Sequence, residues 1–123
     1  MAIINQVRGQ GEYDCLLAYS GGKDSTYTLA LLRDEYGLRV LAVTFDNGFV
    51  SPGAFANIRR VVEALDVDHL FIKPHFGLLR KLFVAASTGE IFSPAALQRA
   101  SGICNACITL VKNVAWRTAI ERR

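Results

Sequence analysis

The residue types best suited to chemistry lie in the run Ser20–Ser25, which reads SGGKDS. The run stands between an apolar segment, Cys15–Tyr19, and a stretch with helical periodicity. A turn there offers the unpaired backbone N–H groups and the positive dipole end of a helix to an anion. Its glycines allow close approach, its lysine adds a cation, and its two serine hydroxyls can donate to oxygens. The run therefore predicts a phosphate-binding turn.

Two well-known phosphate loops are excluded at this position. A P-loop of the GTPase type requires Gly at position 17 and Ser or Thr at position 24, where this chain has Leu17 and Asp24. The dinucleotide fingerprint requires three glycines spaced G-x-G-x-x-G, and this turn has only an adjacent pair. The turn must belong to another class.

The turn resembles the SGGxDS signature of the PP-loop ATP pyrophosphatases, also called the adenine nucleotide alpha hydrolases. Members hold the pyrophosphate of ATP in this loop while the α-phosphorus is attacked, which leaves an adenylylated substrate and pyrophosphate. Lys23 fills the variable position, and Lys23 and Asp24 are the loop residues expected to act in catalysis. The alternative is a tight connection capped by Asp24. The resemblance implies that Lys23 binds ATP together with the other residues of the turn, Ser20, Gly21, Gly22, Asp24 and Ser25.

A second candidate segment, Asp46–Gly48, follows the second predicted strand. Open α/β folds bind ligands at the carboxyl ends of their strands. The resemblance places this strand end near adenine and ribose, and Asp46 could coordinate Mg²⁺ together with substrate phosphates. An ordinary turn is the alternative, because Asp, Asn and Gly are turn residues. The residues expected to offer backbone contacts to adenine are Val43, Thr44 and Phe45.

Cys104 and Cys107 form a C-x-x-C pair at the start of the last predicted helix. Helix N-termini favour thiolates, which bind metals or attack electrophiles. A closed zinc site needs four ligands, and the chain offers besides this pair only Cys15, His69 and His75. We expect Cys15 to be a small core residue of a strand and both histidines to lie on the surface, so no complete metal site is visible.

The resemblance gives the pair another meaning. PP-loop enzymes that thiolate tRNA bases carry a C-x-x-C followed by a helix, and a third cysteine joins it to hold an iron–sulfur cluster or to carry sulfur. Sugar amidotransferases of the same superfamily also use a C-x-x-C. Cys104 and Cys107 are thus expected to act in catalysis or to bind a cluster or zinc, and they do not decide between sulfur and nitrogen chemistry. The alternative is simple packing at a helix start.

The elements that must position these residues alternate between short apolar runs and helical periods, which is typical of βαβ units and a parallel sheet. We expect strands over Cys15–Tyr19, Arg39–Phe45 and His69–Ile72. About five helices are expected: one to Tyr36, one from Pro52, one through 79–86, one from Pro94 to about Ala100, and a last one through 107–115. The fold class is α/β, a three-layer α/β/α arrangement with strand order 3-2-1.

The 123 residues suffice for a single domain, 1–123. Family sheets usually run 3-2-1-4-5, so we expect strands 4 and 5 to be missing and the domain to be incomplete, as a recombinant piece, a proteolytic fragment or a truncated gene product. Without strand four, the first strand would be a bare apolar edge. A homodimer covering that edge is therefore expected.

Composition limits the possible compartments and partners. Hydrophobic residues make up 51%, which excludes disorder, and the net charge of +3 does not by itself indicate nucleic acid. No apolar run is long enough to span a membrane, no signal peptide is evident, and an odd cysteine count argues against a disulfide framework, so we expect a cytoplasmic protein. Basic residues are scattered and could form a solvated face or contact RNA.

The leading hypothesis is an ATP-binding PP-loop domain of an enzyme that adenylylates an acceptor, either tRNA or a small molecule such as a sugar, and then transfers sulfur or nitrogen. Two alternatives remain open. One is a nucleotide-binding or assembly module without turnover of its own, and the other is a metal-binding interaction module built on Cys104 and Cys107.

Overall fold

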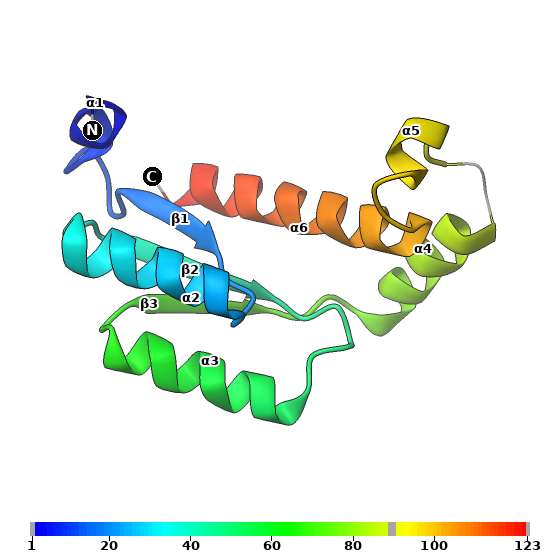
Figure 1. Ribbon diagram of the computed structural model, residues 1–123, viewed down its shortest axis with the longest axis horizontal. Coiled ribbons are helices and arrows are strands. Elements are labelled where there is room, and N and C mark those ends of the chain that lie inside the picture. Colours follow the sequence, from blue (N-terminus) through cyan, green and yellow to red (C-terminus); the bar gives the residue numbers. More distant parts are fainter. Residues whose placement is uncertain (1, 89–90, 123) are drawn as a thin grey trace.

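A computed structural model of the protein describes residues 2–88 and 91–122. Short strands and helices alternate along most of its length (Figure 1). The strands are β1 (Cys15–Ala18), β2 (Val40–Phe45) and β3 (Asp68–Ile72). The helices are α1 (Ala2–Val7), α2 (Lys23–Ala30), the π-helical η1 (Leu31–Glu35), α3 (Pro52–Ala64), α4 (Phe76–Thr88), α5 (Pro94–Leu97) and α6 (Gly102–Glu121).

The three strands form one parallel sheet in the order β1-β2-β3, as predicted. Ala42 of β2 lies opposite Leu17 on one side and His69 on the other. The central strand β2 is buried along all but its last residue, whereas β1 and β3 are only partly buried. This matches the apolar, β-branched composition of β2, which suits a strand covered on both faces.

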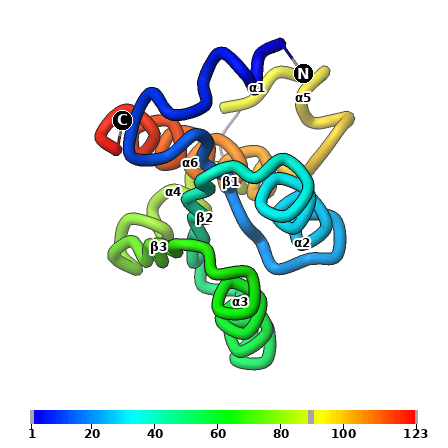
Figure 2. Tube along the Cα trace, turned by 90° about the vertical axis from the view of Figure 1, so that its left-hand side faces the viewer, coloured from blue at the N-terminus to red at the C-terminus, as the bar shows by residue number. Residues whose placement is uncertain are grey.

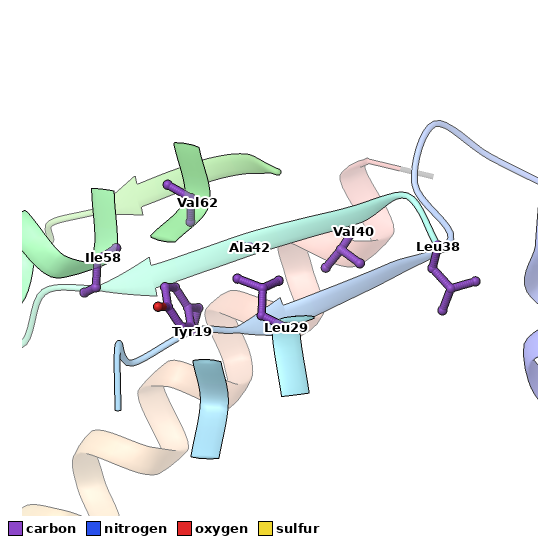
Figure 3. Packing of buried hydrophobic residues seen from close by; sticks show 7 residues of the cluster. All are labelled: Tyr19, Leu29, Leu38, Val40, Ala42, Ile58 and Val62. Carbon is purple, nitrogen blue, oxygen red and sulfur yellow. The ribbon is translucent and has the colours of Figure 1, made fainter. Parts of the chain in front are cut away.

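Helices cover both faces of the sheet: α2 and α3 lie on one side and α6 on the other, and α4 packs against α6 beyond the ends of the strands (Figures 1 and 2). The main core lies under α2 and α3, where alternate residues of β2 meet both helices (Figure 3). Cys15 packs at the margin of this core, as predicted, and burial raises the pKa of its thiol. The core consists of Tyr19, Leu29, Leu38, Val40, Ala42, Ile58 and Val62.

The helix boundaries confirm the capping signals of the sequence. The Ser51 side chain accepts a hydrogen bond from the Ala54 N–H at 3.2 Å, with Pro52 in the first turn of α3. Ser93 caps α5 in the same manner. These positions combine an N-cap serine with a proline whose missing N–H costs nothing there.

Three local features differ from the expectation. Helix α1 was not predicted, because its six residues are too few for a periodic pattern. The helix that begins at Lys23 ends in a π-turn, in which the Tyr36 N–H reaches the Leu31 carbonyl at 3.0 Å. Helix α6 begins at Gly102, two residues before Cys104, since Ser101 caps it.

None of the helices described here combines the length and the apolar character that a membrane span requires.

Candidate functional site

The SGGKDS turn connects β1 to α2 at the carboxyl edge of the sheet. Tyr19 anchors its start, since its N–H donates to the Val43 carbonyl at 2.8 Å and its hydroxyl lies 2.9 Å from the Thr26 hydroxyl. Gly22 is the N-cap of α2 and makes no side-chain cap bond. The first intrahelical bond joins the Thr26 N–H to the Gly22 carbonyl at 2.9 Å. Helix geometry therefore leaves the N–H groups of the first turn of α2 without helical acceptors, as an anion site requires.

Gly21 allows the turn to pass directly over helix α3. Its φ of +79° lies in the left-handed region, and a Cβ added there would stand 2.5 Å from Cγ1 of Ile58. Ile58 is almost fully buried and belongs to the core. The loop is therefore seated on a fixed part of the fold, and glycine is required both by its backbone and by the space available.

The two serines of the turn already hold each other in place. Their hydroxyl oxygens lie 3.1 Å apart, and the Ser25 hydroxyl donates to the Gly22 carbonyl at 3.1 Å. The side chains of Lys23 and Asp24 are exposed at the start of α2. This arrangement can present a cation, hydroxyls and backbone N–H groups to phosphate oxygens at one helix end.

Asp46 directly follows β2 and is buried. One carboxylate oxygen accepts from the Gly48 N–H at 2.8 Å, and the other lies 3.6 Å from Nζ of Lys73. Mg²⁺ is often held by one carboxylate together with substrate phosphates, so this donor set is compatible with it. A bound cation would either share the Asp46 carboxylate with Lys73 or displace the Lys73 ammonium from it.

Thr44 and Phe45 lie at the end of β2, between two neighbouring strands. The Thr44 hydroxyl donates to the Tyr19 carbonyl at 2.8 Å and lies 2.8 Å from Nε2 of His69. Because the Tyr19 carbonyl can only accept, the Thr44 hydroxyl donates its hydrogen to it. Nε2–H of His69 must therefore be the donor to the Thr44 oxygen. His69 is thus half-buried and not the surface residue that was expected, because β3 places it beside Thr44. Burial lowers the pKa of His69, which is consistent with a neutral ring. The suggested adenine contacts of Thr44 and Phe45 stay a prediction.

The cysteine pair reaches the same edge of the sheet through one of its members. The Asn47 side-chain amide donates to Sγ of Cys107 at 3.5 Å, and its Oδ1 accepts from the Phe49 N–H at 3.0 Å. Cys107 is half-buried there, whereas Cys104 is exposed. Sequence reasoning missed this link, since the two residues are 60 positions apart and Asn47 had only a turn signal.

The described residues contain no group of three or more His, Cys, Asp or Glu side chains placed to hold a metal. Cys15 lies at the start of β1, and His75 accepts from the Gly77 N–H at 3.1 Å. Cys104 and Cys107 therefore do not form a closed zinc or cluster site with other described residues. Such a site would need further ligands besides two thiolates.

Comparisons with known proteins show what the chain is similar to. No family model matches it. The chain is 29% identical over 115 residues to the uncharacterized protein MJ1599 of Methanocaldococcus jannaschii, covering 94% of this chain and 37% of that protein. It is 32% identical over 82 residues to a glutamine-hydrolyzing GMP synthase of Baumannia cicadellinicola, covering 65% of this chain and 16% of the synthase.

The solved structure of an NH3-dependent NAD synthetase from Campylobacter jejuni superimposes with a TM-score of 0.68 at 15% identity. The match covers 98% of this chain and 48% of the synthetase. The chain is therefore similar to members of the PP-loop ATP pyrophosphatase superfamily, as its SGGKDS turn predicted. The predicted α/β fold is confirmed. The chain spans less than two fifths of the length of the curated relatives reported above.

Proposed function

We propose that this chain is the ATP-binding part of an enzyme that adenylylates an acceptor and releases pyrophosphate. The observation that carries the proposal is the SGGKDS turn, held by Tyr19 and Ile58 so that the open N-terminus of α2 points out of the carboxyl edge of the sheet. Similarity to members of the PP-loop superfamily supports the same chemistry. The whole enzyme's activity is part of the proposal.

In this mechanism the turn binds the β- and γ-phosphates through backbone N–H groups and the Ser20 and Ser25 hydroxyls. An acceptor oxygen forms a bond to the α-phosphorus, and the bond from that phosphorus to the bridging oxygen breaks. The electron pair leaves with pyrophosphate, whose developing charge Lys23 stabilises. Asp24 helps to hold the turn on the nucleotide, and Asp46 is the carboxylate that would hold Mg²⁺, which would neutralise phosphate charge.

In a second step sulfur or nitrogen would bond to the activated acceptor atom while the bond from that atom to the adenylylated oxygen breaks, and AMP would leave with the electron pair. We propose Cys107 as the thiol nearest this step, because its contact with Asn47 brings it to the end of β2 beside Asp46. Cys104, exposed one helical turn earlier, would be its partner in carrying sulfur or in anchoring a cluster or zinc with ligands from elsewhere. We derive no step through such a group. The acceptor is a tRNA base or a small molecule.

Pyrophosphate release and ATP binding test the proposal together. We expect Lys23→Ala and Asp24→Ala to weaken ATP binding at least fivefold while the chain stays folded. Lys81→Ala, which removes an exposed cation from α4, is the matched control and should leave binding unchanged. Unaltered ATP affinity in both loop variants would refute the loop assignment. ATP binding without pyrophosphate release from any tested acceptor would favour a binding module without turnover.

We also propose a homodimer across β1. Among the described residues this strand is hydrogen-bonded to β2 alone, and it is only partly buried although α6 packs against it. A strand edge with free backbone groups pairs readily with another chain. Sedimentation equilibrium at rising concentration should show a dimer, and a monomer throughout would refute this proposal.

A further inference from the structure

A pocket of about 440 Å³ lies between α3 and β3, on the face of the sheet that carries the PP-loop turn. Its volume is within the range of small-molecule sites. Ile58 lines it and also touches the turn at Gly21, and Asp46 lines it at the end of β2. The pocket therefore adjoins the proposed ATP site at two separate residues.

The apolar walls of the pocket are suited to a flat ring. Phe55 of α3 and Phe71 of β3 meet edge to face, with centroids 4.9 Å apart and planes at 78°. Phe71 nevertheless remains 45% exposed, although it stands on the face of the sheet that α3 covers. Two rings set nearly at right angles leave a corner in which a third ring can stack on one and meet the edge of the other. Such a ligand would cover apolar surface now facing water.

The polar groups of the pocket favour an anion. Lys73 and Arg59 line it, and Lys73 is matched by Asp46 at 3.6 Å. Among the described residues, the Arg59 guanidinium is paired with Glu63 alone, at 4.0 Å, and both of these side chains are largely exposed. His69 also lines the pocket as a neutral ring whose Nε2–H is committed to Thr44. The lining thus carries one cation in excess, and Arg59, whose pair with Glu63 is long and exposed, can turn to a ligand carboxylate.

We propose that this pocket binds a planar ring carrying a carboxylate, and that such a compound is the acceptor activated at the ATP site, an assignment that rests on the proposed function. The carboxylate oxygen forms the new bond to the α-phosphorus, and the bond to the bridging oxygen breaks. Pyrophosphate leaves with the electron pair, and no proton has to be removed from an ionised acceptor. This favours a small molecule over a tRNA base.

Binding to the full chain, followed by NMR, tests the pocket without any need for turnover. The probe is 2-naphthoate, with 2-naphthamide as the neutral match and decanoate as the flexible anion. We expect saturable binding of 2-naphthoate that is about fivefold tighter than that of the amide, the size of an exposed ion pair. Decanoate should bind more weakly than 2-naphthoate.

Variants locate the binding. Phe71→Leu keeps an apolar side chain but removes the ring, and it should weaken both naphthyl probes about fivefold. Arg59→Gln should abolish the preference for the carboxylate over the amide. Arg60→Gln is the matched control, because this neighbouring arginine bonds to Asn57 and does not line the pocket. Binding that is absent, or that ignores both Phe71 and Arg59, would overturn the proposal.

ATP distinguishes this proposal from the proposed function. Both ligands should bind together, and Lys23→Ala should weaken ATP but not 2-naphthoate. Displacement of 2-naphthoate by adenosine would show that the pocket belongs to the nucleotide base, which refutes the acceptor assignment. If 2-naphthoate binds as expected while Lys23→Ala leaves ATP affinity unchanged, the ATP site is wrong and only the ligand pocket stands.

Discussion

Replacing Gly21 by alanine tests how the PP-loop turn is seated on the core. Two separate costs arise from the structure. An L-residue at a φ of +79° loses about 1–2 kcal/mol relative to glycine. The new Cβ also stands 2.5 Å from Cγ1 and 3.0 Å from Cδ1 of Ile58, in a packed core where overfilling costs about 1–3 kcal/mol. We therefore expect Gly21→Ala to lower the free energy of unfolding by about 2–5 kcal/mol.

Gly37→Ala is the matched control, because it separates the two costs. Gly37 has a φ of +59°, and the described chain leaves open space around its position. This variant carries the backbone cost without the collision, so about 1–2 kcal/mol is expected. Urea unfolding followed by circular dichroism measures both variants on the same chain, and ATP titration of the folded Gly21→Ala protein should also show weakened binding.

A double-mutant cycle isolates the collision itself. Ile58→Ala alone should cost about 2–5 kcal/mol as a buried truncation. Combined with Gly21→Ala, the total should fall below the sum of the single losses by about 1–3 kcal/mol, since the added methyl then enters the vacated space. Equal losses in Gly21→Ala and Gly37→Ala, or strict additivity with Ile58→Ala, would refute the close approach of the loop to α3.

Three further outcomes are expected. The Asp14 carboxylate is hydrogen-bonded to Arg39 and almost fully buried, and this ion pair holds its pKa well below the ordinary value. The free energy of unfolding that the pair contributes is therefore present at neutral pH and falls as the pH drops below about 3.9. Acid unfolding of Asp14→Asn should lack this loss. Burial lowers the pKa of His69, so stability should also decline as the pH falls below about 6.5, and His69→Gln should flatten that part of the profile. Iodoacetamide should modify exposed Cys104 faster than half-buried Cys107, as followed by mass spectrometry, and equal rates would contradict the position of Cys107.

Local signals predicted the features that depend on neighbouring residues. Ser51 with Pro52 marks a helix start whatever the rest of the fold does, and the turn at Ser20–Ser25 is defined by its own glycines and hydroxyls. The apolar, β-branched run of Arg39–Phe45 likewise predicted the strand β2. These properties depend on backbone geometry and burial, which a short sequence window largely determines.

Contacts between distant segments could not be predicted in this way. The bond from Asn47 to Cys107 and the approach of Ile58 to Gly21 depend on how α6 and α3 pack on the sheet. The partnership of Asp14 with Arg39 depends on the register of β1 with β2. No periodicity or spacing encodes such pairs, because each results from tertiary packing.

Ile58 has a consequence for protein engineering. One of its sides supports the phosphate loop, and another lines the pocket between α3 and β3. A mutational library meant to change ligand preference in that pocket should therefore also disturb the proposed ATP-binding turn when residue 58 is varied. Substitutions can be placed at Phe55, Arg59 and Phe71, while Ile58 is best kept constant because it contacts both the turn and the pocket.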